Sequence, residues 1–172
     1  LAFLMSPNAS HGQKELFLSI FFEKTGALST FNRLSSVEVH TEYVISAGRR
    51  IDILLKSAVE PVWMGIENKL YWHTADQHQQ LADYAAYLNR KSQGNYLLLY
   101  LAPEGKAIEE KSLTKKQQEA LTNSKKLMQI SYEKHLIPAL ETFESQCVAE
   151  NVKQFAKYLT TKLKQVIMGI YS

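Results

Sequence analysis

The sequence is poor in cysteine and has no long apolar run. Its single cysteine, Cys147, excludes a disulfide within the chain and a zinc cluster built on cysteines. A chain of this kind is expected in a reducing, intracellular compartment, and we predict a cytoplasmic location. No apolar run approaches the roughly 18–20 residues that cross a bilayer. The opening segment 1–5 is too short for the apolar region of a signal peptide.

The sequence also lacks internal repeats, low-complexity tracts and an evident linker. We therefore predict one domain over residues 1–172, long enough to bury a sizeable core. Because the first residue is Leu1 and not methionine, we expect a further helix to precede it. Hydrophobic residues make up 45% and charged residues 22%, as in average globular proteins. The net charge of +3 is too small to indicate a polyanionic partner by itself.

Hydrophobic periodicity predicts a helix followed by a β-meander. Apolar residues recur at helical spacing over 13–24, after a turn-forming segment at 6–12. Alternating and apolar patterns then predict three strands, separated by turns at 46–48 and 57–61. These strands lie near residues 37–43, 50–55 and 62–70. Strands joined by such tight turns form an antiparallel meander.

The second half of the chain predicts a crossover and a helical C-terminal part. Helical periodicity returns over 75–91, and the apolar run at 95–101 is typical of a strand buried on both faces. A strand reached through a helix is expected to pair in parallel. The polar segment 102–126 is predicted to be a loop with a helical piece. A short strand at 128–132 and helices at 133–147 and 150–169 follow.

Asp52, Glu67 and Lys69 are predicted to converge on one patch of the meander. Asp52 lies among apolar residues, where an isolated carboxylate is costly to bury without a cation or hydrogen-bond partners. Glu67 and Lys69 are two apart in a strand, so their side chains point to the same face. The segment between Asp52 and Glu67 is long enough for a tight turn and a returning strand. Two carboxylates and one ammonium are thus expected to lie together.

Two carboxylates beside an ammonium suit the hydrolysis of a phosphodiester. That reaction needs charge neutralisation on the phosphoryl oxygens and a hydroxide at neutral pH. Mg²⁺ prefers one or two carboxylates, waters and substrate phosphate to a complete protein cage. We expect Asp52 and Glu67 to bind the metal, with the main-chain carbonyl of Asn68 as a third ligand. Lys69 is expected to hold the attacking water or to stabilise the developing negative charge.

Several segments resemble motifs of the PD-(D/E)xK nuclease superfamily. They are Arg-Arg-Ile-Asp-Ile-Leu at 49–54, Ile-Glu-Asn-Lys at 66–69 and Gln-Leu-Ala-Asp-Tyr at 80–84. The chain looks most like a restriction-endonuclease-like branch with a Glu-Asn-Lys strand and a Gln-x-x-x-Tyr helix. Segments 6–12 and 130–133 also resemble that branch, so nearly the whole chain is covered. The resemblance implies an α+β fold with an α-β-β-β-α-β core, a mixed central sheet flanked by helices, and additional C-terminal helices.

The resemblance also implies roles for single residues. Asp52 matches the strand aspartate of the family, and Glu67 and Lys69 match its Glu-x-Lys pair. Gln80 and Tyr84 match its helix motif and share one helix face, from which they would position substrate or metal. A structural ion pair of Asp52 with Lys69, and an ordinary surface pair of Gln80 with Tyr84, are the alternatives.

A further family acid is expected near the metal. Glu42, at the end of the first predicted strand, is the first candidate, and Glu15 on the first helix competes with it. The alternatives are an ion pair of Glu42 with Arg49 or Arg50, and an exposed first-turn acid in the case of Glu15. Ile51 stands where the name of the motif has proline, and this departure leaves the metal ligands unchanged.

His73, Asp76 and His78 superficially resemble a metal site but lack a third strong ligand at zinc spacing. We interpret them as the polar start of the helix at 75–91, with substrate contact as the alternative. Four aromatic residues are interpreted as core or cleft-lining side chains and not as base-stacking platforms: Trp63, Trp72, Tyr96 and Tyr100.

Together these patterns predict a nuclease that depends on Mg²⁺ or Mn²⁺ and cuts nucleic acid, with DNA as the first expectation and RNA as an alternative. The rival hypothesis is a catalytically silent nucleic-acid-binding or assembly module of the same fold. A purely binding role does not require all three of Asp52, Glu67 and Lys69, which argues against that rival. The sequence predicts no membrane partner and leaves the oligomeric state open, a homodimer included.

Overall fold

The computed structural model describes residues 1–27, 30–46 and 48–169 and is built on one mixed sheet. Its strands are β1 (Val37–Ser46), β2 (Arg49–Ser57), β3 (Trp63–Asn68), β4 (Tyr96–Ala102) and β5 (Leu127–Ser131), in the spatial order β1-β2-β3-β4-β5. The pairs β1–β2 and β2–β3 are antiparallel, whereas β3–β4 and β4–β5 are parallel. The change of direction therefore occurs at β3.

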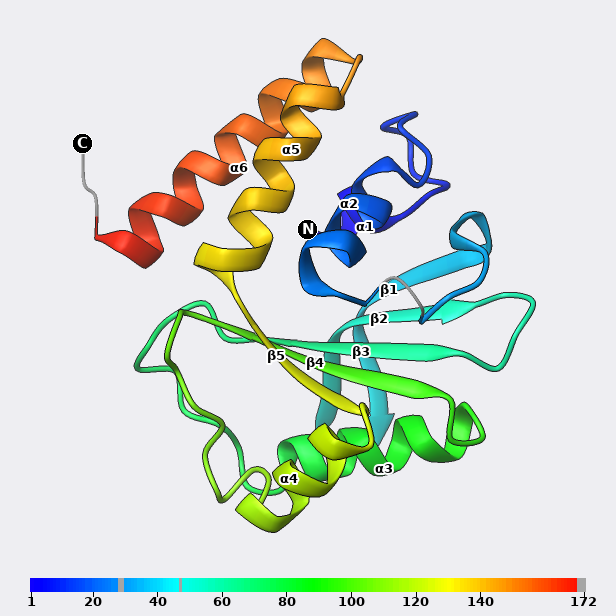
Figure 1. Ribbon diagram of the computed structural model, residues 1–172, viewed down its shortest axis with the longest axis vertical. Helices are drawn as coiled ribbons and strands as arrows, with labels where there is room; N and C mark the ends of the chain where they lie inside the picture. The colour runs from blue at the N-terminus through cyan, green and yellow to red at the C-terminus, as the bar shows by residue number, and fades with distance from the viewer. Residues whose placement is uncertain (28–29, 47, 170–172) are drawn as a thin grey trace.

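Helices cover both faces of this sheet (Figure 1). One face carries α1 (Ala2–Met5), α2 (Leu16–Thr25), α5 (Ile137–Gln146) and α6 (Glu150–Met168). The other face carries α3 (Gln80–Lys91) and α4 (Lys115–Asn123). A 3₁₀ helix, η1 (Leu34–Ser36), leads into β1, and a π-helical segment, η2 (Tyr132–Leu136), joins β5 to α5. No helix in the described ranges is both long and apolar enough to cross a membrane.

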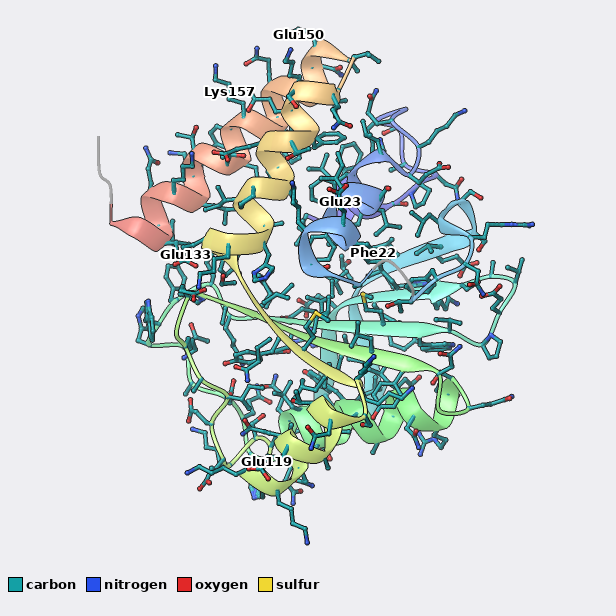
Figure 2. All side chains as sticks on the ribbon, viewed as in Figure 1. Phe22, Glu23, Glu119, Glu133, Glu150 and Lys157 are labelled. Carbon is teal, nitrogen blue, oxygen red and sulfur yellow. The ribbon has the colours of Figure 1, made fainter. Side chains whose placement is uncertain are left out.

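The two faces of the sheet enclose separate apolar cores. On the α2 side, Phe17 and Phe21 pack with Ile53 and Leu55 of β2. On the α3 side, the buried side chains include Leu54, Leu81, Leu88 and Leu98. Figure 2 shows side chains filling the space between the sheet and both helical layers, with Phe22 on α2 and Glu119 on the outer side of α4. Each fully buried Leu or Phe contributes about 1.5–3 kcal/mol to stability.

The element order confirms the predicted fold. An α-β-β-β-α-β core is formed by α2, β1, β2, β3, α3 and β4, and helices follow it at the C-terminal end. Every residue of β4 is buried, as its continuous apolar sequence predicts, and β4 pairs in parallel after a helical crossover. The predicted helical piece in 102–126 is α4, whose Thr114 and Gln117 form a capping box.

Two predicted helix starts are wrong. The helix predicted over 75–91 begins at Gln80, because residues 75–79 form part of the loop that approaches it. The helix predicted over 133–147 starts as the π-helical η2, and regular α-helix begins only at Ile137. Pro138 lies in the first turn of α5, just after η2. In the predicted turn 46–48, Ala47 lies outside the described residues.

Candidate active site

β2 is distorted at Asp52. Ile53 packs in the core on the α2 side and Leu54 in the core on the α3 side, as strand alternation requires. Ile51 should lie on the same side as Ile53, yet it packs with Leu54. Asp52 is the residue between them, and Glu42, opposite it in β1, has a φ of +49°. The alternation therefore breaks at the one acidic residue of β2, which keeps that carboxylate out of either core.

The end of β3 holds the Asp52 side chain. The backbone N–H of Asn68 donates to Oδ2 of Asp52 at 2.7 Å, and the Asn68 side-chain oxygen accepts from the Tyr132 hydroxyl. The register of β2 and β3, continued by one pair, places Asp52 opposite Glu67. The N–H and C=O of one strand residue face the same neighbouring strand. The Asn68 carbonyl is therefore directed to the Asp52 side as well.

Lys69 lies at the centre of a buried polar cluster. Its Nζ is 2.7 Å from Oε1 of Glu67 and 3.4 Å from Oδ1 of Asp76. It also donates to Oε1 of Gln80 at 3.1 Å. None of these four residues is more than 5% exposed. The carboxylates of Glu67 and Asp76 thus share the Lys69 ammonium in a buried environment.

α3 contributes the two side chains predicted to position substrate or metal. Gln80 Nε2 donates to Oε1 of Glu67 at 3.1 Å and to the Tyr84 hydroxyl oxygen at 3.0 Å. The Tyr84 hydroxyl donates in turn to the carbonyl of Arg50. Both side chains are buried and point at the acid–lysine pair, so they do not form a surface pair. Gln80 links α3 to β3, and Tyr84 links α3 to β2.

The interpretation of His73, Asp76 and His78 as a polar helix start is wrong for Asp76, which belongs to the buried Lys69 cluster. The loop before α3 buries Asp76 against Lys69, whereas both histidines are exposed. The Tyr100 hydroxyl donates to Oδ1 of Asp76 at 3.2 Å. Sequence reasoning missed this residue because its partners come from distant segments. The one feature of the sequence that could have indicated Asp76 is its position between two predicted site residues, seven after Lys69 and four before Gln80.

A pair of reciprocal hydrogen bonds fixes the backbone around Asp76. Its N–H donates to Oε1 of Glu109 at 2.8 Å, and the Glu109 N–H donates to Oδ2 of Asp76 at 2.9 Å. These bonds fasten the loop between β3 and α3 to the loop between β4 and α4, and the two loops run side by side (Figure 1). The Asp76 carboxylate is therefore held on three sides.

Burial raises the pKa values of the two metal-ligand candidates, Asp52 and Glu67. Burial, followed by the charge of Asp52, raises the pKa of Glu67 from 4.5 to about 7. Burial also raises the pKa of Asp52, against the hydrogen bond from Asn68 that lowers it. Burial lowers the pKa of Lys69, but its contacts with Glu67 and Asp76 outweigh this and raise it overall. Lys69 therefore stays protonated and positively charged. A second cation near Asp52 and Glu67 would stabilise their ionised carboxylates.

The donor set fits a hard divalent cation. Within the described residues, Oε2 of Glu67 is buried without a hydrogen-bond partner, and such an oxygen is costly to leave uncompensated. In the same described part of the chain, no three His, Cys, Asp or Glu side chains gather as a metal site. Mg²⁺ and Mn²⁺ accept fewer protein ligands, taking carboxylate, carbonyl and water oxygens. Asp52, Glu67 and the Asn68 carbonyl supply such oxygens.

Comparison with known proteins identifies the family. A family model described as the PD-(D/E)XK nuclease superfamily matches residues 1–164. The chain belongs to the PD-(D/E)XK nuclease superfamily. Membership confirms the resemblance drawn from the motifs and assigns the five-stranded mixed sheet to the fold of this superfamily. Neither the curated proteins nor the solved structures contain a match to the chain. PD-(D/E)XK nucleases generally use divalent metals, in agreement with the donor set.

The two candidates for the further acid lie in different places. Glu42 is inside β1, not at its end as predicted, and pairs with Arg50 at 3.5 Å. Its charge also raises the pKa of Asp52, so it lies within electrostatic reach of the site. Glu15 precedes α2 as its N-cap residue, on the other side of the sheet from α3. Arg49 donates to Asp83 at 2.7 Å on α3. Of the two acids, Glu42 is the one near Asp52.

Proposed function

We propose that this PD-(D/E)XK protein is a metal-dependent nuclease that hydrolyses phosphodiester bonds in DNA. The observation that carries the proposal is the buried Oε2 of Glu67, which has no hydrogen-bond partner among the described residues and lies next to Asp52 and to a fixed lysine. Asp52, Glu67 and the Asn68 carbonyl are the residues that would hold Mg²⁺ or Mn²⁺. When bound, such an ion lowers the pKa of a water and neutralises charge on the phosphate.

Lys69 acts in this proposal as a positioned cation. Its Nζ is held by Glu67, Asp76 and Gln80, so the ammonium does not have to be ordered during the reaction. It orients the attacking water or stabilises the negative charge that develops on the phosphoryl oxygens. Gln80 holds the Glu67 carboxylate, and Tyr84 holds the β2 main chain at Arg50. Together they position the carboxylates of Glu67 and Asp52.

Glu42 belongs to the proposal as an accessory acid. Its ion pair with Arg50 is largely exposed, which leaves the carboxylate free to exchange that partner for a water molecule. Since it acts beyond the metal ligands, Glu42→Gln is expected to reduce cleavage less than Asp52→Asn does.

The test is cleavage of single- and double-stranded DNA and RNA with Mg²⁺ or Mn²⁺, with EDTA as the metal-free control. Asp52→Asn and Lys69→Ala are expected to lower the rate by about 10²–10³ or more. Glu141→Gln is the matched control, because that acid pairs with Lys164 on the surface between α5 and α6. Full activity of Asp52→Asn would contradict the assignment.

The same assay separates the nuclease from the silent nucleic-acid-binding or assembly module. A silent module would bind nucleic acid without metal-dependent cutting, and Mn²⁺ would not raise the unfolding temperature of the wild type. The proposal instead expects Mn²⁺ to stabilise the wild type and Glu141→Gln but not Glu67→Gln. A DNA substrate is supported only if DNA is cut faster than RNA of the same sequence.

A further inference from the structure

Three aromatic side chains are exposed on the loop that follows Lys69. Tyr71 is 45% exposed and Trp72 is 56% exposed, and His73 is exposed beside them. The interpretation of Trp72 as a core side chain is therefore wrong. The other tryptophan, Trp63, is half-buried and packs against Tyr43. An isolated exposed aromatic residue is ordinary. Three in succession, separated from the lysine of a nuclease motif by Leu70 alone, form a local apolar surface that the core does not use.

This aromatic loop is held in place by its neighbours. The Trp72 carbonyl accepts from Lys106 Nζ at 2.7 Å. The edge of the indole lies over Gly105, where an added Cβ would stand 3.5 Å from Cη2 of Trp72. The rings of Tyr71 and His73 are nearly parallel, with an angle of 17° and centroids 5.3 Å apart. The Tyr71 and His73 rings therefore stack on each other, and the backbone of the loop is fastened at Trp72.

Positive charge lies next to these rings. Lys106 directs its ammonium to a carbonyl oxygen, an uncharged acceptor that does not cancel its charge. It also lines a hollow of about 340 Å³ together with Tyr100, Glu104 and Lys134. Lys134 is paired there with Glu104 at 2.6 Å, so Lys106 is the residue that brings positive charge to the rings. Tyr100 is the residue whose hydroxyl is bound to Asp76 in the Lys69 cluster. The hollow is thus bordered by Lys106, which holds the aromatic loop, and by Tyr100, which holds Asp76.

The aromatic loop follows Lys69 closely in the chain. Trp72 is three residues after Lys69, so their Cα atoms are at most about 11 Å apart. Stacked bases rise by about 3.4 Å each, which makes this reach about three nucleotides. A base that rests on the indole could therefore belong to the strand held at Asp52 and Glu67.

We propose that Tyr71 and Trp72 form a stacking platform for an unpaired nucleobase of the strand that this site cuts, an inference that rests on the proposed nuclease function. Bases inside a duplex already stack on both faces, whereas an unpaired base has a free face for an aromatic ring. Stacking of this kind contributes about 1–3 kcal/mol per base and does not depend on the type of base. Lys106 attracts the neighbouring phosphate. The preferred substrate is therefore single-stranded or locally unpaired.

The test is binding of fluorescein-labelled dT15, the matching U15 and a 15-base-pair DNA duplex to the full chain in EDTA, by anisotropy. Trp72→Ala is expected to weaken binding of both single strands about 5- to 150-fold, from the stacking energy above. Binding of the duplex should stay unchanged. Trp72→Phe keeps a ring and should restore most of the loss. Tyr158→Ala is the control, because that tyrosine is 61% exposed on α6, which covers the other face of the sheet.

Each outcome has one meaning for the platform. Unchanged single-strand binding by Trp72→Ala, or an equal loss on the single strands and the duplex, would overturn it. So would a loss that Trp72→Phe does not restore. A wild type that binds single strands but cuts nothing with Mg²⁺ or Mn²⁺ would contradict the nuclease and leave the platform supported. Thermal unfolding of each variant verifies that it is folded.

Discussion

Asp76 shows how the site controls its lysine. Glu67 alone would hold the Lys69 ammonium by one contact, and Asp76 and Gln80 add two further contacts. Among the described residues Asp76 has an ion pair with Lys69 at 3.4 Å, and its charge also contributes to the raised pKa of Glu67. We therefore regard it as a positioning residue.

Asp76→Asn is expected to lower kcat about 10-fold or more and to change KM little, because the charge that holds Lys69 is removed while the shape of the side chain remains. Steady-state cleavage measures both constants. Glu110→Gln is the matched control, an exposed acid on the neighbouring loop that pairs with Lys115 at 3.7 Å. An unchanged kcat, or a loss confined to KM, would show that Asp76 does not position the lysine for the chemical step.

At the scale of elements, the site is assembled where α3 meets the ends of β2 and β3. Gln80 is the first residue of α3, and Tyr84 stands one turn further along the same face. One helix thus contacts the carboxylate of β3 and the main chain of β2. The position of α3 and the geometry of the two carboxylates are consequently coupled.

Tyr84→Phe tests that coupling. The substitution leaves the Arg50 carbonyl without this donor in a partly buried place, and loss of such a hydrogen bond costs about 0.5–1.5 kcal/mol of unfolding free energy. Urea denaturation measures the loss. Tyr87→Phe on the same helix is the control, because its hydroxyl makes only a 3.5 Å contact with Tyr43 in a half-buried place. Equal, small losses in both variants would contradict a structural link through Tyr84.

For the whole molecule, the buried acid makes stability depend on pH and metal. The pKa of Glu67 is about 7 in the folded chain and near 4.5 in the unfolded chain. Between these two pH values the folded chain therefore keeps a proton that the unfolded chain releases. In EDTA this group therefore lowers the unfolding free energy as pH rises from 4.5 to 7 and has no effect below 4.5. A bound divalent cation should reverse the loss by compensating the carboxylate.

Comparison of wild type with Glu67→Gln isolates this contribution. Between pH 4.5 and 7.5 in EDTA, the wild type should lose up to about 3 kcal/mol relative to the variant, at about 1.36 kcal/mol per pKa unit. Urea denaturation at several pH values gives the difference, and Mn²⁺ should restore the wild type alone. Parallel pH profiles of the two proteins would mean that Glu67 does not titrate in this range.

The sequence by itself determined the order of the elements and the meeting of Glu67 with Lys69, because both depend on local periodicity and on turn length. Asp52 opposite Glu67 follows from the same meander. Tertiary structure decided the rest. Asp76 is buried only because Glu109 and Tyr100, from the β4 side, fix the loop around it. Trp72 is exposed because Lys106 and Gly105 hold its loop over the surface, a contact between segments more than 30 residues apart that no local pattern encodes.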